Sequence, residues 1–336
     1  MKFHTPIRLE DAAQLLNCRF AGDPDHLVTG MNEIHRVEAG DLCFVDYHKY
    51  YDKALGSAAT TILIDQEVAC PSGKGLLISD DPFRDFNKVA MHFQPQRPLD
   101  TAQSYNLETD FPQVKAIGKN VVMGENVTLG ADVEIGHNAV IGSDVVIGEG
   151  TKIHANVTIY DHTLIGKHCT VNSGAVLGSE AFYYKKRDYG RDKMLSVGRV
   201  ILGDHVDIGA GCTIDRGVSH NTVIGDWTKL DNLVQVGHDT VIGKRCVIAA
   251  QVGIAGVVQI EDDVNIWGQV GVVQDLTIGQ GATLMGKTGV MSSLEGGKAY
   301  GGMVADDARN FLRKEAALKR LIEIMPELEG LLKREA

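Results

Sequence analysis

The residues best suited to chemistry lie around His238, which stands two positions after the aliphatic Val236. Eighteen residues further on, Gly256 stands two positions after another aliphatic residue, Ile254. A histidine is a general base near neutral pH, and a glycine amide can hold an oxyanion with no side chain in the way. If the two residues share one face of the fold, they are suited to acyl transfer to an amine or a hydroxyl.

Two carboxylates accompany this pair. Asp239 directly follows the histidine and could orient the imidazole or stabilise its charge. Asp275 comes 36 residues after Asp239, which is twice the 18-residue spacing. A histidine by itself is weak support for catalysis, because most histidines of such a region are turn or surface residues. Six others lie in or near the same region: His137, His154, His162, His168, His205 and His220.

The spacing of 18 comes from a repeat of six residues. An aliphatic residue recurs at every sixth position over 117–177, 202–214 and 224–290, which makes 26 repeats. A period of six predicts a parallel β-helix, in which each repeat gives a short strand and a turn. Three repeats close one triangular coil with the aliphatic side chains inside, so residues 18 apart meet on neighbouring coils.

Glycine is abundant, with 38 in 336 residues, and 14 of these glycines directly follow the inward aliphatic residue. Glycine tolerates a positive φ at no steric cost. We therefore expect these glycines to form the sharp corners of the coils.

The repeat divides this mainly β chain into three parts. Residues 1–100 lack it, and an amphipathic helix at 8–17 with apolar runs at 42–45, 61–64 and 75–78 predicts a small α/β domain. Residues 101–300 are expected to form the β-helix, with an inserted loop at about 179–199. A polar linker that contains prolines precedes the first repeat. Residues 301–336 predict a helical extension that Pro326 ends or kinks.

The composition excludes several classes of protein. A net charge of −11 argues against a nucleic-acid partner. No apolar run approaches the ~20 residues of a membrane helix, and the first residues do not resemble a signal peptide. We expect a cytoplasmic protein with no integral membrane segment. Because the six cysteines include no CxxC pair and the histidines no HExxH motif, we expect no metal and no cofactor.

Two basic clusters oppose the acidic average. Residues 185–199 and 309–320 each carry a net charge of +4. Each could bind an acidic partner or a phosphate, or could be a solvated loop or helix face.

Several stretches resemble one family, the UDP-3-O-acylglucosamine N-acyltransferases (the LpxD family of lipid A biosynthesis). The resemblance extends over nearly the whole chain. It is carried by 198–204 with 213–217, by 155–160 with 172–174, by 231–238, and by 39–44 with 49–50.

The resemblance implies a left-handed β-helix and a homotrimer with active sites between neighbouring prisms. The donor would be a 3-hydroxyacyl group on acyl carrier protein, and the acceptor the 2-amino group of a UDP-linked 3-O-acylglucosamine. His238 would be the general base, and the Gly256 amide would stabilise the tetrahedral oxyanion. The C-terminal basic cluster would bind the acidic carrier protein through Arg309, Arg313 and Lys314.

For the acceptor, the resemblance implies binding by Asp231 and Gln235. Phe44 and Tyr50 would flank the uracil ring, since aromatic faces stack on a flat base. We add Tyr47, Asp239 and Asp275 to the substrate-binding candidates, although the family has Asn, Asn and His at these three places.

Another departure is the stretch 178–183. The family has Gly-x-Asp-Gly-Phe-Gly there, and this sequence has Tyr183 at the position of the last glycine. The pair His238-Asp239 is also similar to the O-acyltransferase that acts earlier in the same pathway, but that enzyme lacks the N-terminal domain. Two alternatives remain open. The chain could acylate a different nucleotide-linked amino sugar, or it could be a non-catalytic trimeric β-helix scaffold.

Overall fold

A computed structural model of the chain describes residues 1–95, 105, 107–302 and 305–335. It comprises two compact units, Met1–Gly301 and Gly302–Ala336. Most of the linker that we expected between the N-terminal domain and the β-helix lies outside the described residues. The second unit is the helix α5 (Ala308–Glu335), which runs through Pro326 and does not end there, contrary to one form of the prediction.

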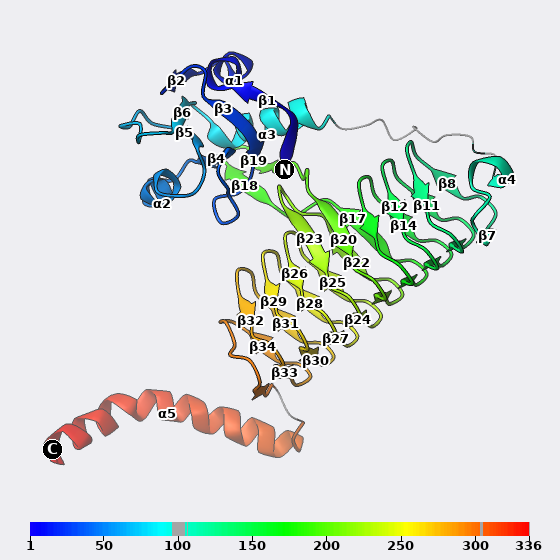
Figure 1. Cartoon of the computed structure of the whole chain (residues 1–336). Coiled ribbons are helices and arrows are strands. Elements are labelled where there is room, and N and C mark those ends of the chain that lie inside the picture. The colour runs from blue at the N-terminus through cyan, green and yellow to red at the C-terminus, as the bar shows by residue number, and fades with distance from the viewer. Residues whose placement is uncertain (96–104, 106, 303–304, 336) are drawn as a thin grey trace. The chain divides into compact units, whose positions relative to one another are not determined.

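The N-terminal region is a six-stranded sheet with helices on both faces (Figure 1). Helices α1 and α3 pack on one face and α2 on the other. The predicted helix and three central strands are present, as α1, β4, β5 and β6. The elements are β1 (Lys2–Arg8), α1 (Leu9–Leu16), β2 (Arg19–Ala21), β3 (Leu27–Met31), β4 (Asp41–Val45), η1 (His48–Tyr50), α2 (Tyr51–Leu55), β5 (Thr61–Ile64), β6 (Gly75–Ile78) and α3 (Pro82–Phe93).

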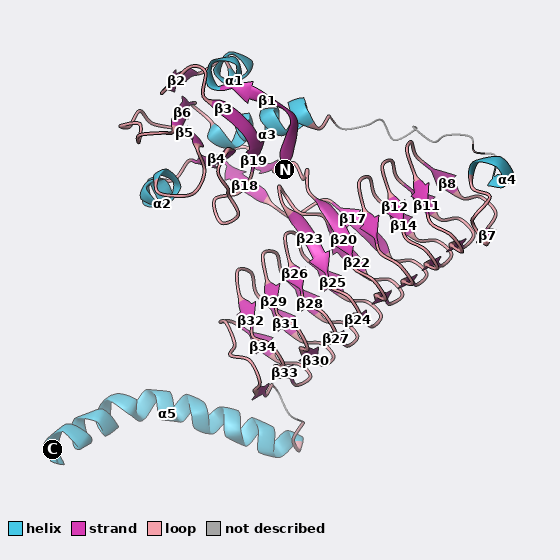
Figure 2. Cartoon of the chain, viewed as in Figure 1, coloured by secondary structure: helices cyan, strands magenta, loops and turns pink. Residues whose placement is uncertain are grey.

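The repeats form a parallel β-helix with three sheets, as predicted (Figure 2). After the short helix α4 (Leu107–Asp110), successive strands are added to the three sheets in turn, and the inward aliphatic side chains fill one continuous core.

We name the sheets by their number of strands. The ten-strand face comprises β7 (Ala116–Ile117), β10 (Glu134–Ile135), β13 (Lys152–Ile153), β16 (Thr170–Val171), β21 (Asp207–Ile208), β24 (Lys229–Leu230), β27 (Val247–Ile248), β30 (Asn265–Ile266), β33 (Thr283–Leu284) and β35 (Ala299–Tyr300). The nine-strand face comprises β8 (Val122–Met123), β11 (Val140–Ile141), β14 (Thr158–Ile159), β17 (Val176–Ser179), β22 (Thr213–Asp215), β25 (Gln235–Val236), β28 (Gly253–Ile254), β31 (Gly271–Val272) and β34 (Gly289–Val290). The eight-strand face comprises β9 (Thr128–Leu129), β12 (Val146–Ile147), β15 (Leu164–Ile165), β20 (Arg199–Leu202), β23 (Asn221–Ile224), β26 (Val241–Ile242), β29 (Gln259–Ile260) and β32 (Thr277–Ile278).

Both breaks in the repeat lie at the same corner of the prism. Most paired strands are 18 residues apart, as in Ile135 with Ile153. The inserted loop follows β17 and carries the antiparallel hairpin β18 (Tyr184–Arg187) and β19 (Gly190–Lys193). The second break lengthens the turn after β22 in the next coil, so that Ile214 pairs with Val236. Each of these turns joins the nine-strand face to the eight-strand face.

The glycines after the inward aliphatic residue serve a purpose that differs from our expectation. Of the 14, only Gly178 has a positive φ; that conformation is mostly taken by Asn, Asp, His and other residues further along the turn. A Cβ at any of the other 13 would lie 2.3–2.7 Å from an atom of the next coil. Glycine is therefore required by the close stacking of coils and not by the bend.

The N-terminal domain and the prism share a hydrophobic core. Ala181, Met194, Val197 and Val218, from the two interrupted turns, pack with the core residues of helices α1 and α3. The side-chain amide of Asn87 on α3 bonds the backbone of Lys193 and Leu195 beside the hairpin, at 3.0 Å each. The sequence interruptions thus attach the domain at the corner of the prism that carries His238.

Candidate active site

His238 and Gly256 meet at the corner that follows the nine-strand face, as the 18-residue spacing predicted. His238 follows β25, and Gly256 follows β28 on the next coil. A Cβ built on Gly256 would lie 2.6 Å from Nε2 of His238, so the imidazole occupies the space that a side chain would fill. The backbone N–H of Gly256 has no hydrogen-bond acceptor among the described residues. The His238 imidazole and a bare backbone amide are therefore adjacent.

The other imidazole nitrogen is held by the neighbouring carboxylate. Nδ1 of His238 lies 2.9 Å from Oδ2 of Asp239, whose side chain is 1% exposed. The same carboxylate accepts the N–H groups of Val218 at 2.8 Å and His220 at 3.1 Å. A carboxylate held in this way fixes the ring with Nδ1 as donor, which leaves Nε2 as the free base.

This carboxylate also sets the charge of the imidazole. Burial opposes the protonated ring, but the hydrogen bond and charge of Asp239 outweigh it and raise the pKa of His238 above its ordinary value. Burial by itself would raise the pKa of Asp239. The hydrogen bonds from His238 and from the N–H of Val218 outweigh burial and hold this carboxyl pKa below its usual range.

A second carboxylate, Asp215, lies at the end of β22 at the same corner. Its two oxygens accept hydrogen bonds from Ser179 at 2.7 Å and from the amide of Gln235 at 3.0 Å. Burial raises its pKa, an effect that Ser179 and the charge of His238 oppose. The predicted acceptor residue Gln235, which also bonds Thr213, therefore lies beside the catalytic candidates.

Two residues of the site escaped the sequence analysis as functional candidates. The ring of Tyr183 is parallel to that of His238, with centroids 6.1 Å apart. Glu33, in the loop after β3, donates its N–H to Oγ of Ser219 at 3.0 Å. Burial and the charge of Asp239 raise the pKa of Glu33 to about 8, although His238 opposes this. The departure from the family motif at Tyr183 could have identified this residue as a candidate. No sequence feature pointed to Glu33, because it lies far from His238 in the sequence.

The remaining prism candidates are divided between two corners. Asp275 is exposed one coil beyond Gly256, at the same corner, and its N–H bonds the Gly256 carbonyl at 3.3 Å. Asp231 follows β24 and lies at the preceding corner, between the ten-strand and nine-strand faces. Within one chain the structure therefore does not bring Asp231 together with His238.

The three aromatic candidates of the N-terminal domain have different environments. Phe44 is half-buried and packs on Phe86, with ring centroids 4.9 Å apart. Tyr47 and Tyr50 are 63% and 44% exposed, and their ring centroids are 6.1 Å apart. The exposed pair is free to stack on a ligand, whereas much of Phe44 belongs to the core.

The two basic clusters also differ. Arg187 of the inserted hairpin bonds both oxygens of Asp81, at 2.9 and 2.7 Å, and Lys185 bonds Asp46. These cations hold the hairpin against the N-terminal domain. In the C-terminal unit, Arg309, Arg313 and Lys314 are exposed on α5, and Lys314 bonds Asp306 at 2.5 Å.

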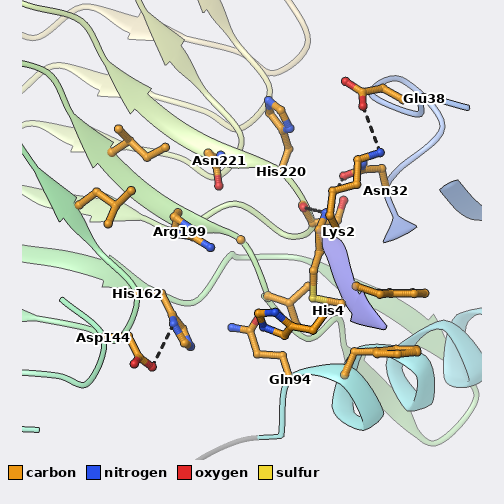
Figure 3. A pocket seen from close by; sticks show the side chains of 18 of the residues that line it. Lys2, His4, Asn32, Glu38, Gln94, Asp144, His162, Arg199, His220 and Asn221 are labelled. Carbon is orange, nitrogen blue, oxygen red and sulfur yellow. Dashed lines mark hydrogen bonds and ion pairs between the residues drawn. The ribbon is translucent and has the colours of Figure 1, made fainter. Parts of the chain in front are cut away.

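A cavity of about 870 Å³ lies next to the site, between β1 and the prism (Figure 3). Arg199, His162 and His220 line it from the prism, and Lys2 and His4 line it from β1. His238 and Gly256 are not among its lining residues. Asn32 and Ser219 are, so the cavity adjoins the loop that carries Glu33.

Over the described ranges, no helix is long and apolar enough to cross a membrane. The same part of the chain contains no group of three or more His, Cys, Asp or Glu residues arranged to hold a metal ion. That the protein needs no metal and no cofactor stays a prediction.

Comparison with known proteins shows which family models the chain matches. Residues 25–92 match the family model of UDP-3-O-(3-hydroxymyristoyl) glucosamine N-acyltransferase, LpxD. Residues 144–179 and 221–256 match the bacterial transferase hexapeptide model, and 116–160 match the hexapeptide repeat of succinyl-transferase. The β-helix of this chain is therefore built from the hexapeptide repeats of bacterial transferases.

Full-length relatives give the family. A UDP-3-O-acylglucosamine N-acyltransferase of Oleidesulfovibrio alaskensis is 46% identical over 98% of this chain and 94% of its own. One of Sinorhizobium fredii is 43% identical over 94% and 93%. This chain belongs to the UDP-3-O-acylglucosamine N-acyltransferase family and is an acyltransferase, which sets aside the scaffold alternative. The crystal structure of a Francisella novicida UDP-N-acetylglucosamine acyltransferase is 25% identical, with a TM-score of 0.51 over 60% of this chain and 73% of its own.

Proposed function

We propose that the chain transfers a 3-hydroxyacyl group from acyl carrier protein to the 2-amino group of UDP-3-O-(3-hydroxyacyl)glucosamine, in lipid A biosynthesis, with His238 as general base. The observation that carries this role is the position of Nε2 against Gly256 while Nδ1 is bound to Asp239. A base must reach the attacking nitrogen and an amide must reach the carbonyl oxygen, and both groups lie at one corner.

The chemistry follows from these two contacts. The amine nitrogen attacks the thioester carbon, the C–N bond forms, and the carbonyl electrons move onto oxygen. The Gly256 N–H donates to that oxyanion, while Nε2 takes a proton from nitrogen. When the C–S bond breaks, the imidazolium returns its proton to the leaving sulfur, and Asp239 stabilises the cation in the interval.

The acceptor would lie between the prism and the N-terminal domain. Gln235 lies beside His238, which supports a role for it in binding the sugar. The exposed rings of Tyr47 and Tyr50 are suited to stacking on uracil. Asp231 lies at a different corner from His238, so its part in the site requires a neighbouring chain, and we propose the homotrimer on this ground.

The donor partner is proposed from charge. Arg309, Arg313 and Lys314 form an exposed basic cluster in a chain of net charge −11, which is suited to an acidic carrier protein. The variant Arg309→Glu/Arg313→Glu should raise KM for acyl carrier protein about 10-fold with little change in kcat. Arg191→Glu, a reversal outside this cluster, is the matched control. We place this reaction in the cytoplasm.

A product assay tests the function. His238→Ala should lower kcat by about 10²–10⁴-fold in a mass-spectrometric assay with 3-hydroxyacyl carrier proteins, while His154→Ala, an exposed prism histidine, stays active. Near-normal turnover by folded His238→Ala would remove the proposed base.

A second candidate is acylation of a different nucleotide-linked amino sugar. Tyr183 stands against His238 where the resemblance leads us to expect glycine, so the acceptor side of the site carries an additional ring. A panel of UDP- and dTDP-linked amino sugars would separate the two candidates by which acceptor gives the highest kcat/KM.

A further inference from the structure

Glu33 is the unpaired member of a group of three acids that act on His238. The charges of Asp239, Glu33 and Asp215 all raise the pKa of the imidazole. Asp239 and Asp215 have their oxygens occupied by hydrogen bonds. Oε2 of Glu33 is buried and has no partner among the described residues.

The position of Glu33 is fixed by the loop that binds the catalytic dyad. Its N–H donates to Ser219, which lies between Val218 and His220, and the amides of these two residues hold Asp239. The charge of Glu33 also acts on Tyr183, whose ring is parallel to that of His238. Glu33 therefore belongs to the N-terminal domain by sequence and to the prism site by position.

A buried carboxyl oxygen without a partner is costly, since desolvation is not compensated by a hydrogen bond. Among the described residues no cation is bonded to the Glu33 carboxyl. The Met1 ammonium bonds Asn32 and Ser219, Nε of Arg36 on the same loop is buried without a partner, and the His238 imidazole is already neutralised by Asp239. A cationic ligand would supply what is missing. A hydroxyl would supply the hydrogen bond alone, whereas a cation also brings a positive charge to a site that already holds three carboxyl groups.

The proton balance of the proposed reaction calls for a second acceptor. An amine that binds as R–NH₃⁺ and leaves as an amide R–NH–C(O)R′ loses two protons. His238 carries one of them to the leaving sulfur. The other must leave the nitrogen before it can attack, because an ammonium nitrogen has no lone pair.

We propose that Glu33 binds the acceptor's amino group as an ammonium ion and takes its first proton. The inference rests on the proposed function. In this step one N–H bond of the ammonium breaks, the carboxylate of Glu33 becomes a carboxylic acid, and a neutral amine remains beside Nε2 of His238. An amine beside an electron-withdrawing carbon titrates at about 8. That value is close to the pKa of Glu33, so the proton can pass in either direction.

The proton then has a route to water. Asn32 and Ser219 both line the 870 Å³ cavity, the backbone N–H of Glu33 donates to Ser219, and the Glu33 side chain is itself partly exposed. The carboxylic acid can therefore return its proton to solvent between turnovers without passing it through the dyad.

Binding, and not turnover, gives the cleanest test. The affinities of the intact protein for UDP-glucosamine and UDP-glucose are measured by calorimetry at pH 8, close to the pKa of Glu33 and of the amine, where the carboxylate and the ammonium ion are both present. We expect the amino sugar to bind at least about 10-fold more tightly, and Glu33→Gln to bring this ratio close to one, by loss of affinity for the amino sugar alone. Glu38→Gln, which changes a carboxylate on the same loop that pairs with Lys2, should keep the wild-type ratio.

Two results would overturn the inference: an unchanged ratio in Glu33→Gln, or an equal loss of both sugars. Glu33→Asp, which keeps the charge at a shorter reach, should keep part of the preference for the amino sugar, and an aspartate variant equal to glutamine would count against a charge effect. Failure of the proposed function appears separately, as a wild-type protein that shows the binding preference but forms no acylated product.

Discussion

Oδ2 of Asp239 lies 2.9 Å from Nδ1 of His238, and the same carboxylate holds the backbone of the lengthened turn at Val218 and His220. One buried side chain therefore orients the proposed base and fixes the loop against which the N-terminal domain packs. The placement of the domain and the charge of the base depend on the same residue.

Asp239→Asn should move the acid limb of the pH profile downward. Only the neutral imidazole is a base, so kcat/KM rises with pH through the pKa of His238. The carboxylate raises that pKa, and its loss lets burial dominate and lower it. The midpoint of the limb should fall below that of the wild type, measured as kcat/KM from pH 5 to 9.

The same variant loses charge-assisted bonds to two amides. We expect the free energy of unfolding to fall by about 1.5–3 kcal/mol, measured by urea denaturation at pH 7. An acid limb that stays in place in a folded Asp239→Asn protein would mean that the carboxylate does not control the base.

Tyr183→Ala should move the acid limb in the opposite direction. The ring covers the imidazole, and burial is the largest influence that lowers the pKa of His238. Removing the ring admits water, which favours the charged form, so the midpoint should rise above that of the wild type. Tyr184→Ala changes the next residue, an exposed tyrosine, and should leave the profile unchanged. A limb that falls in Tyr183→Ala would contradict the role of burial.

Gly256→Ala tests the contact between coils. A methyl group there would lie 2.6 Å from Nε2 of His238 and must displace the ring. Misplacement by about 1 Å costs on the order of 10²-fold in rate, so kcat should fall by that factor while the melting temperature changes little. At Gly268 the nearest atom to a new methyl group is 3.4 Å away, so Gly268→Ala is the matched control. Equal activity in both variants would show that the imidazole can move freely.

The sequence predicted the prism well because its signal is periodic. Each inward aliphatic residue occupies an equivalent position in its coil. Counting by 18 residues therefore predicted that His238 and Gly256 lie at matching positions on neighbouring coils. Helix α3 has a local signal that we missed: Asp81 accepts the N–H of Arg84 at its start, and Pro82 is its first residue. The strand β1 was missed because Pro6 weakens the pattern of an edge strand.

The site beyond this pair could not be predicted by spacing. Glu33 lies in the N-terminal domain and Tyr183 in the inserted loop, so both come from segments outside the repeat, where counting by 18 does not apply. The expected use of glycine for positive φ was wrong for a related reason. A repeat shows which residue recurs, but only packing shows that a Cβ at Gly118 would lie 2.5 Å from the backbone nitrogen of His137.

Glu33→Gln should change the pH dependence of stability even without a ligand. The carboxyl has a pKa of about 8 in the folded chain and an ordinary value near 4.3 when unfolded. Between these values the folded state binds more protons than the unfolded state, so this group makes the free energy of unfolding fall as pH rises from about 4.5 to 8.

Glutamine cannot ionise and removes that decline. We expect Glu33→Gln to match the wild type near pH 4.5 and to exceed it increasingly up to pH 8, by on the order of 4 kcal/mol, because the folded and unfolded pKa values differ by more than three units and each unit corresponds to about 1.4 kcal/mol. Urea denaturation at pH 5, 6.5 and 8 measures the difference, with Glu38→Gln as the exposed control on the same loop. A difference that is constant with pH would show that Glu33 is ionised in the folded protein, already paired with a cation, and that the site does not wait for one from the acceptor.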